Sequence, residues 1–344
     1  MQKSSRIRLL AVVGVLALLA ACGSDDEGGG GGATGKVKVT GSSTVEPISS
    51  AAAEAFQGEN GDVQIAVSGP GTSDGFKQFC AGEADIADAS RPIKEEEITA
   101  CKDGGIEYIE LKVGFDGMSV LTAPDNPLEC VNFADLYALL GPESEDVDQW
   151  SKAADLATEL GSDTEFPDLK LDPTGPGEES GTYDSFIEIA FADIAEKRVE
   201  EGKLDEAKVE TTRANYQSSP NDNTIIQNIE GSDGSLGWVG FAFAEDAGDA
   251  VKELQVSAEP GGECVAPDAE TIADASYPLS RSLYIYVDKA KATEGSAVTA
   301  FVDFYLESLP EFVEAGGYVN LPEDQVAATN KTWTDKKVGT QEAS

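Results

Sequence analysis

Three short stretches of the sequence place glycine beside serine and threonine just before residues that fit a helix. They are TGSSTVEP at 40–47, SGPGTSDGF at 68–76 and GEESGTYDSF at 177–186. A helix start presents unpaired backbone N–H groups and a partial positive charge, and glycine lets the backbone approach a ligand closely. One such turn alone is explained by a serine or threonine that caps its helix. Three of them together favour a binding site for an anion.

An arginine occupies a fourth turn, which also follows a strand-like segment. Arg91 comes directly after the residues ADIADAS and before a proline. The planar fork of guanidinium donors matches two oxygens of a tetrahedral oxyanion. The alternative for Arg91 is a surface salt bridge, for which an acidic protein offers many partners.

The composition disfavours several classes of function. The 344 residues carry 64 acidic and 24 basic side chains, a formal net charge of -40, and no histidine. This charge repels nucleic acids and anionic membrane surfaces. The lack of histidine removes the commonest general base and the commonest metal ligand. We therefore expect a protein that is not an enzyme and that needs no cofactor or metal.

The N-terminal residues have the features of an export signal. A basic start is followed by the apolar stretch 9–20, which is too short to span a bilayer comfortably, and by Leu-Ala-Ala-Cys ending at Cys22. This ending resembles a bacterial lipobox, which implies cleavage before Cys22 and attachment of lipid to its sulfur. The alternative is an unmodified secretory signal. Residues 1–22 are thus the expected signal, and the glycine-rich, acidic residues 23–35 are an expected flexible tether.

The other four cysteines are expected to form two disulfides, because an even number of cysteines in an exported chain favours pairing. They are Cys80, Cys101, Cys130 and Cys264. Three pairings are possible. We favour Cys80 with Cys101, which closes a short loop, and Cys130 with Cys264, which ties the two ends of one lobe. A metal site is the alternative, but the spacing matches no zinc motif.

Short apolar runs lead through Gly/Ser/Thr turns into helical patterns, which is the alternation of an α/β protein. Two strand-like segments, 114–124 and 277–287, bracket the middle of the chain, and either could cross between two lobes. The last dozen residues are polar and are expected to fray. The other expected elements are strands at 37–39, at 63–67 and around LGWVGFAFAE, a helix with Ile48, Ala52, Ala55 and Phe56 on one face, and a long helix from Tyr183 to Ile194.

Five motifs, in this order, resemble the phosphate-binding lipoproteins of bacterial phosphate ABC transporters of the Pst type. They are GSSTVEPISSAAAEAF, SGPGTSDGFKQFCAGEADIADASRPIKEEEI, GPGEESGTYDSF, NYQSSPNDNTIIQNI and YPLSRSLYIYV. The resemblance implies an α/β protein with the type II periplasmic-binding-protein fold, in which two α/β lobes joined by two crossover strands clamp phosphate in a cleft. We expect the first lobe at 36–118 and 280–344, and the second at 119–279.

The resemblance also implies phosphate ligands from both lobes. These are Ser43, Thr44, the N–H of Val45 and Thr72 from the first lobe, and Ser180, Gly181 and Thr182 from the second. One branch of the family has an Asp where this chain has Arg91, and takes its arginine from the turn before Ser-Gly-Thr. That turn contains no arginine here. Arg91 is therefore expected to supply the positive charge.

A carboxylate that faces the anion would accept the proton of hydrogen phosphate and would repel fully ionised sulfate. Glu179 is the first candidate because it adjoins Ser180, and Glu46 and Asp222 are the others.

The resemblance implies that the protein captures inorganic phosphate on the extracytoplasmic side of the cell membrane. A lipid-anchored monomer would deliver phosphate to the permease and ATPase subunits of an ABC transporter. The alternatives are a binding protein for another oxyanion such as sulfate, a phosphate sensor or adhesin, and a secreted phosphatase.

Overall fold

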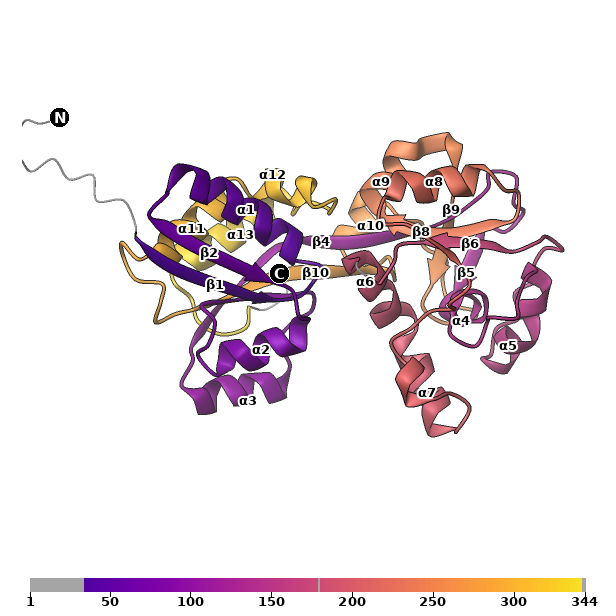
Figure 1. The fold of residues 1–344 in the computed structure, drawn as a ribbon, viewed down its shortest axis with the longest axis horizontal. Helices are drawn as coiled ribbons and strands as arrows, with labels where there is room; N and C mark the ends of the chain where they lie inside the picture. The colour runs from indigo at the N-terminus through magenta and orange to yellow at the C-terminus, as the bar shows by residue number, and fades with distance from the viewer. Residues whose placement is uncertain (1–33, 179, 342–344) are drawn as a thin grey trace, which may run out of the picture. The chain divides into compact units, whose positions relative to one another are not determined.

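The computed structural model describes residues 34–178 and 180–341, which form a mixed α/β structure with a ten-stranded sheet (Figure 1). The strands are β1 (Gly35–Gly41), β2 (Val63–Ser68), β3 (Ile86–Ala89), β4 (Tyr108–Thr122), β5 (Cys130–Asn132), β6 (Asp172–Gly175), β7 (Gln217–Ser218), β8 (Ser235–Gly240), β9 (Lys252–Ser257) and β10 (Ser280–Asp288).

The helices follow the strands in the alternation expected from the sequence. The α-helices are α1 (Glu46–Glu59), α2 (Thr72–Cys80), α3 (Glu95–Gly104), α4 (Phe133–Leu140), α5 (Ala154–Glu159), α6 (Gly181–Ala190), α7 (Ala192–Glu200), α8 (Asp222–Glu230), α9 (Phe241–Ala247), α10 (Ala269–Ala273), α11 (Ala297–Glu307), α12 (Leu309–Ala315) and α13 (Glu323–Thr334). Short 3-10 helices are η1 (Trp150–Ala153), η2 (Glu206–Lys208) and η3 (Gly248–Ala250).

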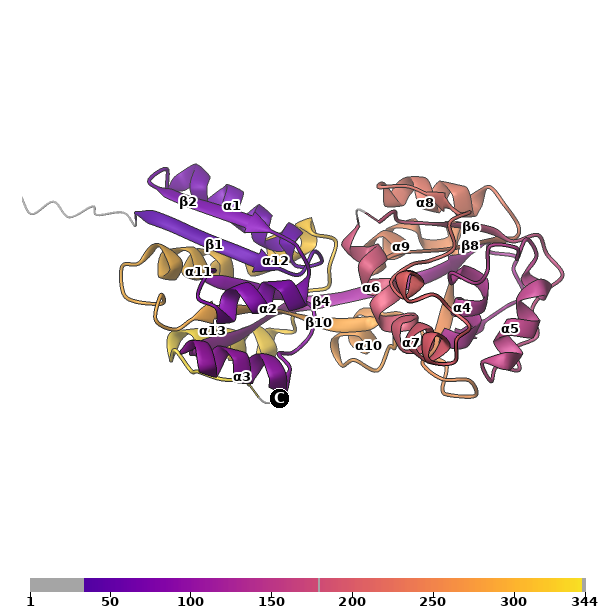
Figure 2. The ribbon, with the colours of Figure 1, turned by 60° about the horizontal axis from the view of Figure 1, so that its bottom comes forward.

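The strand order is β2-β1-β3-β10-β4-β8-β6-β7, with β9 pairing to β4 and β5 pairing to β9. β1 is parallel to β2 and to β3, whereas β10 is antiparallel to both β3 and β4. Figures 1 and 2 show two lobes around this sheet. Helices α1–α3 and α11–α13 pack around β1–β3 in the first lobe, and helices α4–α10 pack around β5–β9 in the second.

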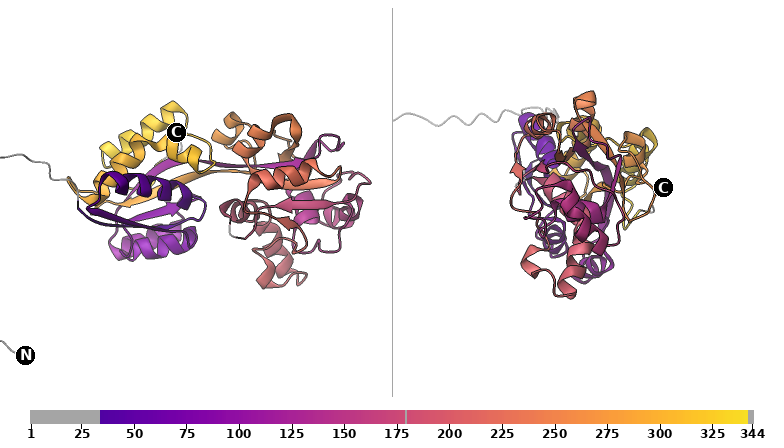
Figure 3. Two further views of the ribbon diagram at one scale, coloured as in Figure 1. Left: turned by 45° about the horizontal axis from the view of Figure 1, so that its top comes forward. Right: turned by 90° about the vertical axis from the view of Figure 1, so that its right-hand side faces the viewer.

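Strands β4 and β10 join the two lobes and run side by side between them (Figure 3). β4 is 15 residues long; its residues up to Gly117 pair with β10, and Met118–Thr122 pair with β8. Both segments that the sequence suggested as crossovers are therefore crossover strands. The expected α/β fold with two lobes is confirmed, while the residue bounds given for the lobes stay a prediction.

Apolar layers cover both faces of the first lobe's sheet. Val39 of β1 and Ile86 of β3 belong to the same buried cluster as Phe56 of α1. Ala87 of β3 points to the other face and belongs to the cluster of Phe76 on α2. Because β1, β2 and β3 are parallel, the turns that follow them emerge at one edge of the sheet, where ligands of open α/β folds bind.

Two expected elements in the second half of the chain end earlier than predicted. The expected helix 183–194 is divided into α6 and α7 at Phe191, which has φ -115° and a fully buried ring. The strand expected through LGWVGFAFAE ends at Gly240, whose non-helical backbone precedes α9. On α1, Ala55 is exposed and Ala53 is buried in its place.

The prediction that the last dozen residues fray is wrong as far as residue 341. Gly339 donates its N–H to the carbonyl of Tyr108, and Gln341 donates its N–H to the carboxylate of Glu110 at 2.8 Å. Glu110 is buried and also accepts a hydrogen bond from Tyr286 at 2.8 Å. Polar composition alone did not reveal that a buried acceptor in β4 holds this segment.

Both favoured disulfides are confirmed. Cys80–Cys101 links α2 to α3, and Cys130–Cys264 links β5 to the segment after β9. The expected signal, the lipidation site Cys22 and the tether as far as residue 33 lie outside the described residues. Within the described ranges, no helix has both the length and the apolar character needed to cross a bilayer.

Candidate anion-binding site

A cavity of about 680 Å³ lies where turns of the first lobe face α6 of the second. Four of the residues expected to bind the anion line it, namely Ser43, Thr44, Thr72 and Arg91. Further lining residues are Ser42, Gly71 and Ser90 from the first lobe, Asp184, Ile187 and Glu188 from α6, and Arg281 from β10. The cavity is thus bordered by neutral donors, by Lys94 and two arginines, and by several carboxylates.

The starts of α1 and α6, which belong to opposite lobes, are in direct contact. Thr44 Oγ1 lies 3.4 Å from the carbonyl oxygen of Gly181 and 3.1 Å from Ser185 Oγ. A Cβ atom at position 181 would lie 2.9 Å from Thr44 Cα and 3.1 Å from Ser43 O. Only glycine permits this approach of two backbones.

The Ser-Gly-Thr turn is organised by its own cap. Ser180 is the N-cap of α6, and its hydroxyl accepts the N–H of Thr182 at 3.2 Å. Gly181 contacts the turn of the first lobe, whereas Ser180 and Thr182 are partly exposed beside that contact. The expected ligands Ser180, Gly181 and Thr182 therefore lie next to the cavity and are not among the described residues that line it.

The first turn is held by Ser42, which the sequence analysis did not select. Its hydroxyl accepts the N–H of Thr44 at 3.2 Å, and its carbonyl accepts the N–H of Val45 at 3.2 Å. The N–H of Val45, an expected ligand, is therefore used within the turn in this structure, and the Val45 side chain is fully buried.

Thr72 connects the second turn to the third. Its hydroxyl accepts the N–H of Ser90 at 3.2 Å and lies 3.0 Å from Ser90 Oγ. Both side chains are buried. The turns after β2 and β3 are thus fixed relative to each other by two hydroxyl groups that border the cavity.

Arg91 borders the cavity and has strong protein partners. Its two terminal nitrogens donate to the carboxylate oxygens of Glu97 at 2.9 and 2.8 Å, and one of them also donates to Ser73 Oγ at 3.0 Å. The hydrogen bonds to Glu97 raise the pKa of Arg91 further above its usual range. The salt bridge considered for Arg91 is therefore present, with Glu97 as its partner.

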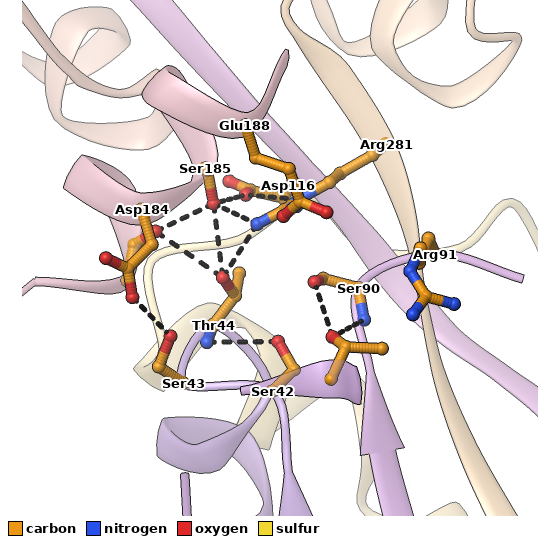
Figure 4. A network of polar contacts seen from close by, with 12 residues as sticks. Ser42, Ser43, Thr44, Ser90, Arg91, Asp116, Asp184, Ser185, Glu188 and Arg281 are labelled. Atoms are coloured by element: carbon orange, nitrogen blue, oxygen red, sulfur yellow. Dashed lines mark hydrogen bonds and ion pairs between the residues drawn. The ribbon is translucent and has the colours of Figure 1, made fainter. Parts of the chain in front are cut away.

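Arg281 is the cation that sequence reasoning missed. Its guanidinium donates to Thr44 Oγ1 at 2.9 Å, to Glu188 Oε2 at 2.5 Å and to Ser185 Oγ. It also forms an ion pair with Asp116, with Nε 3.4 Å from Oδ2. Figure 4 shows these groups converging from both lobes.

Buried Asp116 completes this network. Ser185 Oγ lies 2.7 Å from Asp116 Oδ2 and also 2.7 Å from the carbonyl of Gly181. Burial raises the pKa of the Asp116 carboxyl, and the nearby charge of Arg281 opposes that rise. A charged side chain in each crossover segment was a signal in the sequence: GFDGMSVLT contains Asp116, and LSRSLYIYV contains Arg281.

Asp184 is a carboxylate beside the hydroxyl groups of the first turn. Its Oδ2 accepts a hydrogen bond from Ser43 Oγ at 2.8 Å. Desolvation raises the pKa of Asp184, and the hydrogen bond from Ser43 opposes this. Glu179, the first candidate for a proton acceptor, lies outside the described residues. Glu46 and Asp222, the other two candidates, do not line the cavity. The described carboxylates that line it are Asp74, Asp184, Glu188, Asp193, Glu196 and Glu210.

Two α/β lobes, two crossover strands and a cavity between the lobes define a type II periplasmic-binding-protein fold. A family model described as a PBP superfamily domain matches residues 28–308. Protein SphX of Synechococcus elongatus is 36% identical over 330 residues, which cover 95% of this chain and 90% of SphX. Phosphate-binding protein PstS of Staphylococcus saprophyticus is 31% identical, with 90% of this chain and 88% of PstS covered.

Solved structures agree with this assignment. The crystal structure of a possible phosphate binding protein from Planctomyces limnophilus is 34% identical and has a TM-score of 0.77, with 89% of this chain and 99% of that chain covered. An ABC-type phosphate transport receptor from Vibrio cholerae, 20% identical with a TM-score of 0.58, shares the fold over 83% of this chain and 100% of its own. The chain therefore belongs to the PBP superfamily and, within it, to the family of SphX and the PstS proteins.

Proposed function

We propose that this protein binds inorganic phosphate between its lobes and delivers it to an ABC permease for import. The observation that carries the proposal is the contact between Thr44 and Gly181, where helix starts of opposite lobes meet beside a cavity that contains Arg91 and Arg281. The start of a helix is a common phosphate-binding site, because its free backbone N–H groups point at the anion. The names of the Staphylococcus and Planctomyces relatives support phosphate as the ligand.

The ligands proposed for phosphate come from both lobes. They are the hydroxyl groups of Ser43, Thr44 and Thr72, the N–H of Val45, the side chain of Arg91, and the Ser180-Gly181-Thr182 turn. A hydrogen bond to a charged group contributes roughly 1.5–3 kcal/mol before the costs of ordering are subtracted. Several such bonds are enough for micromolar or tighter binding.

Binding without covalent chemistry needs the lobes to separate and close again. β4 and β10 are the connections about which such a hinge motion would occur. On closing, the Ser-Gly-Thr turn approaches the first lobe's turns and excludes water from the anion. We therefore propose a carrier rather than an enzyme.

The proposed place of action is the outer side of the cytoplasmic membrane. Cys22 would become the mature N-terminus and carry the lipid anchor after removal of residues 1–21, and residues 23–35 would tether the folded part. The proposed partners are the permease and ATPase subunits of a phosphate ABC transporter, which a monomer would approach with its ligand enclosed.

Isothermal titration of the mature protein with phosphate tests the proposal, with sulfate and arsenate as competitors. We expect micromolar or tighter phosphate binding and at least a tenfold loss of affinity in Thr44→Val, which removes the hydroxyl but keeps the shape. Thr99→Val, at an exposed position of α3, is the matched control and should bind as the wild type does. Tighter binding of sulfate than of phosphate would support the alternative oxyanion carrier. Turnover of a phosphate ester that disappears in Ser180→Ala would support the phosphatase alternative.

A further inference from the structure

We infer that Arg281 is a positioning residue that couples the contact between the two lobes to the strands that join them. Through this coupling, Arg281 sets how long a bound anion is retained. The claim about anion retention rests on the proposed function, whereas the claim about coupling does not. The inference starts from the position of the residue in β10 and from the four groups that its guanidinium contacts.

Arg281 is anchored on the crossover strands themselves. In the pairing of β10 with β4, its Cα stands directly opposite the Cα of Asp116. The side chains are 10% and 1% exposed, and Nε lies 3.4 Å from Oδ2. A change in the twist of the two strands therefore moves the guanidinium and its carboxylate partner together.

From this anchor, the guanidinium reaches both lobes. One terminal nitrogen, Nη2, donates to Thr44 Oγ1 at the start of α1 and to Ser185 Oγ on α6. The other, Nη1, donates to Glu188 on the next turn of α6 (Figure 4). Separation of the lobes would break contacts to Thr44 or to α6, so these hydrogen bonds favour the arrangement in which the helix starts touch.

Arginine is suited to this position because of its shape. A planar guanidinium offers five N–H donors in fixed directions, whereas lysine is a single point charge on a flexible chain. Asp116 and Glu188 flank the guanidinium from β4 and α6, and Asp184 stands on the preceding part of α6. A lysine ammonium could contact Thr44 and Ser185 from one nitrogen, as Nη2 does, but that nitrogen could not also hold Asp116 and Glu188, which Nε and Nη1 contact.

Arg198 shows what a purely structural arginine looks like in the same protein. It is 5% exposed and donates to Glu143 and Glu159, so all three of these side chains belong to the second lobe. Its loss should destabilise that lobe without changing the contact between lobes. Arg198 therefore provides a matched control for Arg281.

The test compares Arg281→Gln, Arg281→Lys and Arg198→Gln in the mature protein. Spin labels introduced as unnatural amino acids at the exposed positions Asp103 on α3 and Glu200 on α7 report the distance between the lobes. Stopped-flow measurement gives the rates of phosphate association and dissociation. We expect Arg281→Gln to shift the label distances to longer values and to raise the dissociation rate at least tenfold, with association changed less than threefold. Arg281→Lys should be intermediate.

Arg198→Gln should lower the melting temperature but leave label distances and dissociation rate at wild-type values. Label distances and dissociation within twofold of the wild type in Arg281→Gln would overturn the inference. If the wild type does not bind phosphate, the proposed function fails, and the label distances still decide the role of Arg281. If Arg281→Gln does not fold, Ser185→Ala removes one of its partners, and the same two readouts apply to it.

Discussion

Arg281 and Asp116 stand directly opposite each other on β10 and β4, with Nε of the arginine 3.4 Å from Oδ2 of the aspartate. The ion pair therefore sits on the two strands that connect the lobes, and it also lies against the turn that begins α1. Removing one partner of a buried pair leaves the other charge uncompensated, which typically costs about 3–5 kcal/mol. The same two side chains thus support the fold and connect it to the candidate site.

Gly181→Ala should weaken phosphate binding at least tenfold. The added methyl group would lie 2.9 Å from Thr44 Cα and 3.1 Å from Ser43 O, which are backbone atoms that cannot move aside as a side chain can. The lobes would be held apart, while each lobe keeps its own core. Titration calorimetry measures the affinity. Gly58→Ala is the control, because its methyl group meets nothing within 4 Å; equal binding by both variants would contradict the prediction.

Asp184→Asn should reduce the preference for phosphate over sulfate at least tenfold. A protonated phosphate oxygen can donate a hydrogen bond to this carboxylate, whereas sulfate would bring acceptor against acceptor. Competition binding with the two anions measures the ratio of their affinities. Asp193→Asn, at an exposed position that also lines the cavity, serves as the control. An unchanged ratio in Asp184→Asn would assign the discrimination elsewhere, and Glu179→Gln would then test the residue first proposed.

Asp88→Asn should make the protein more stable at neutral and alkaline pH. Asp88 is fully buried, its Oδ1 accepts from Ser49 at 2.9 Å, and its Oδ2 has no hydrogen-bond partner among the described residues. Burial raises the pKa of this carboxyl to about 8. The folded protein therefore holds a proton that the unfolded chain releases near its ordinary pKa of about 4.

The stability that this proton provides is complete at low pH and is lost as the pH rises to about 8. The free energy of unfolding of the wild type relative to Asp88→Asn should fall by about 1.4 kcal/mol per pH unit between pH 5 and 8 and then level off. Urea unfolding across this range measures the difference. The exposed neighbour Glu83→Gln is the control. A difference that stays constant with pH would show that Asp88 does not titrate in this range.

Replacing the cysteines of the longer disulfide should destabilise the protein more than replacing those of the shorter one. Cys130–Cys264 spans 134 residues and Cys80–Cys101 spans 21. In the chain-entropy model the longer loop contributes about 1.6 kcal/mol more, because the unfolded chain loses more freedom when it is closed. Urea unfolding of the two double Cys→Ser variants compares them. A larger loss from the shorter disulfide would show that packing around Cys80 and Cys101 outweighs loop entropy.

Much of the fold could be predicted because its signals are local. Alternating Val37 and Val39 indicated β1, and Pro47 in the first turn of α1 agreed with the helix found there. The break at Phe191 could not be predicted from periodicity, since its cause is the packing of this ring against Tyr137 and Phe186. Tyr137 belongs to α4, far away in the chain, and no helical pattern records its contact with Phe191.

The candidate site divides in the same way. The glycine and hydroxyl turns could be recognised in the sequence, because capping and anion binding require these residue types at adjacent positions. Arg281 was quoted within its motif but not chosen, because a single arginine in a strand does not reveal its partners. Its pairing with Asp116, 165 positions away, follows from strand register.

By itself, the sequence determined most of the strands and helices, which turns carry donors, and which cysteines were available for disulfides. These properties depend on neighbouring residues and on backbone chemistry. Only the tertiary structure decided that the starts of α1 and α6 touch and that Glu97 pairs with Arg91. It also decided that Arg281 lies between the lobes. The contacts of α1 with α6 and of Arg281 with both lobes join positions far apart in the chain, and the packing of the two lobes against shared strands brings them within hydrogen-bonding distance. Arg91 and Glu97 are only six positions apart, and the turn between β3 and α3 brings them together.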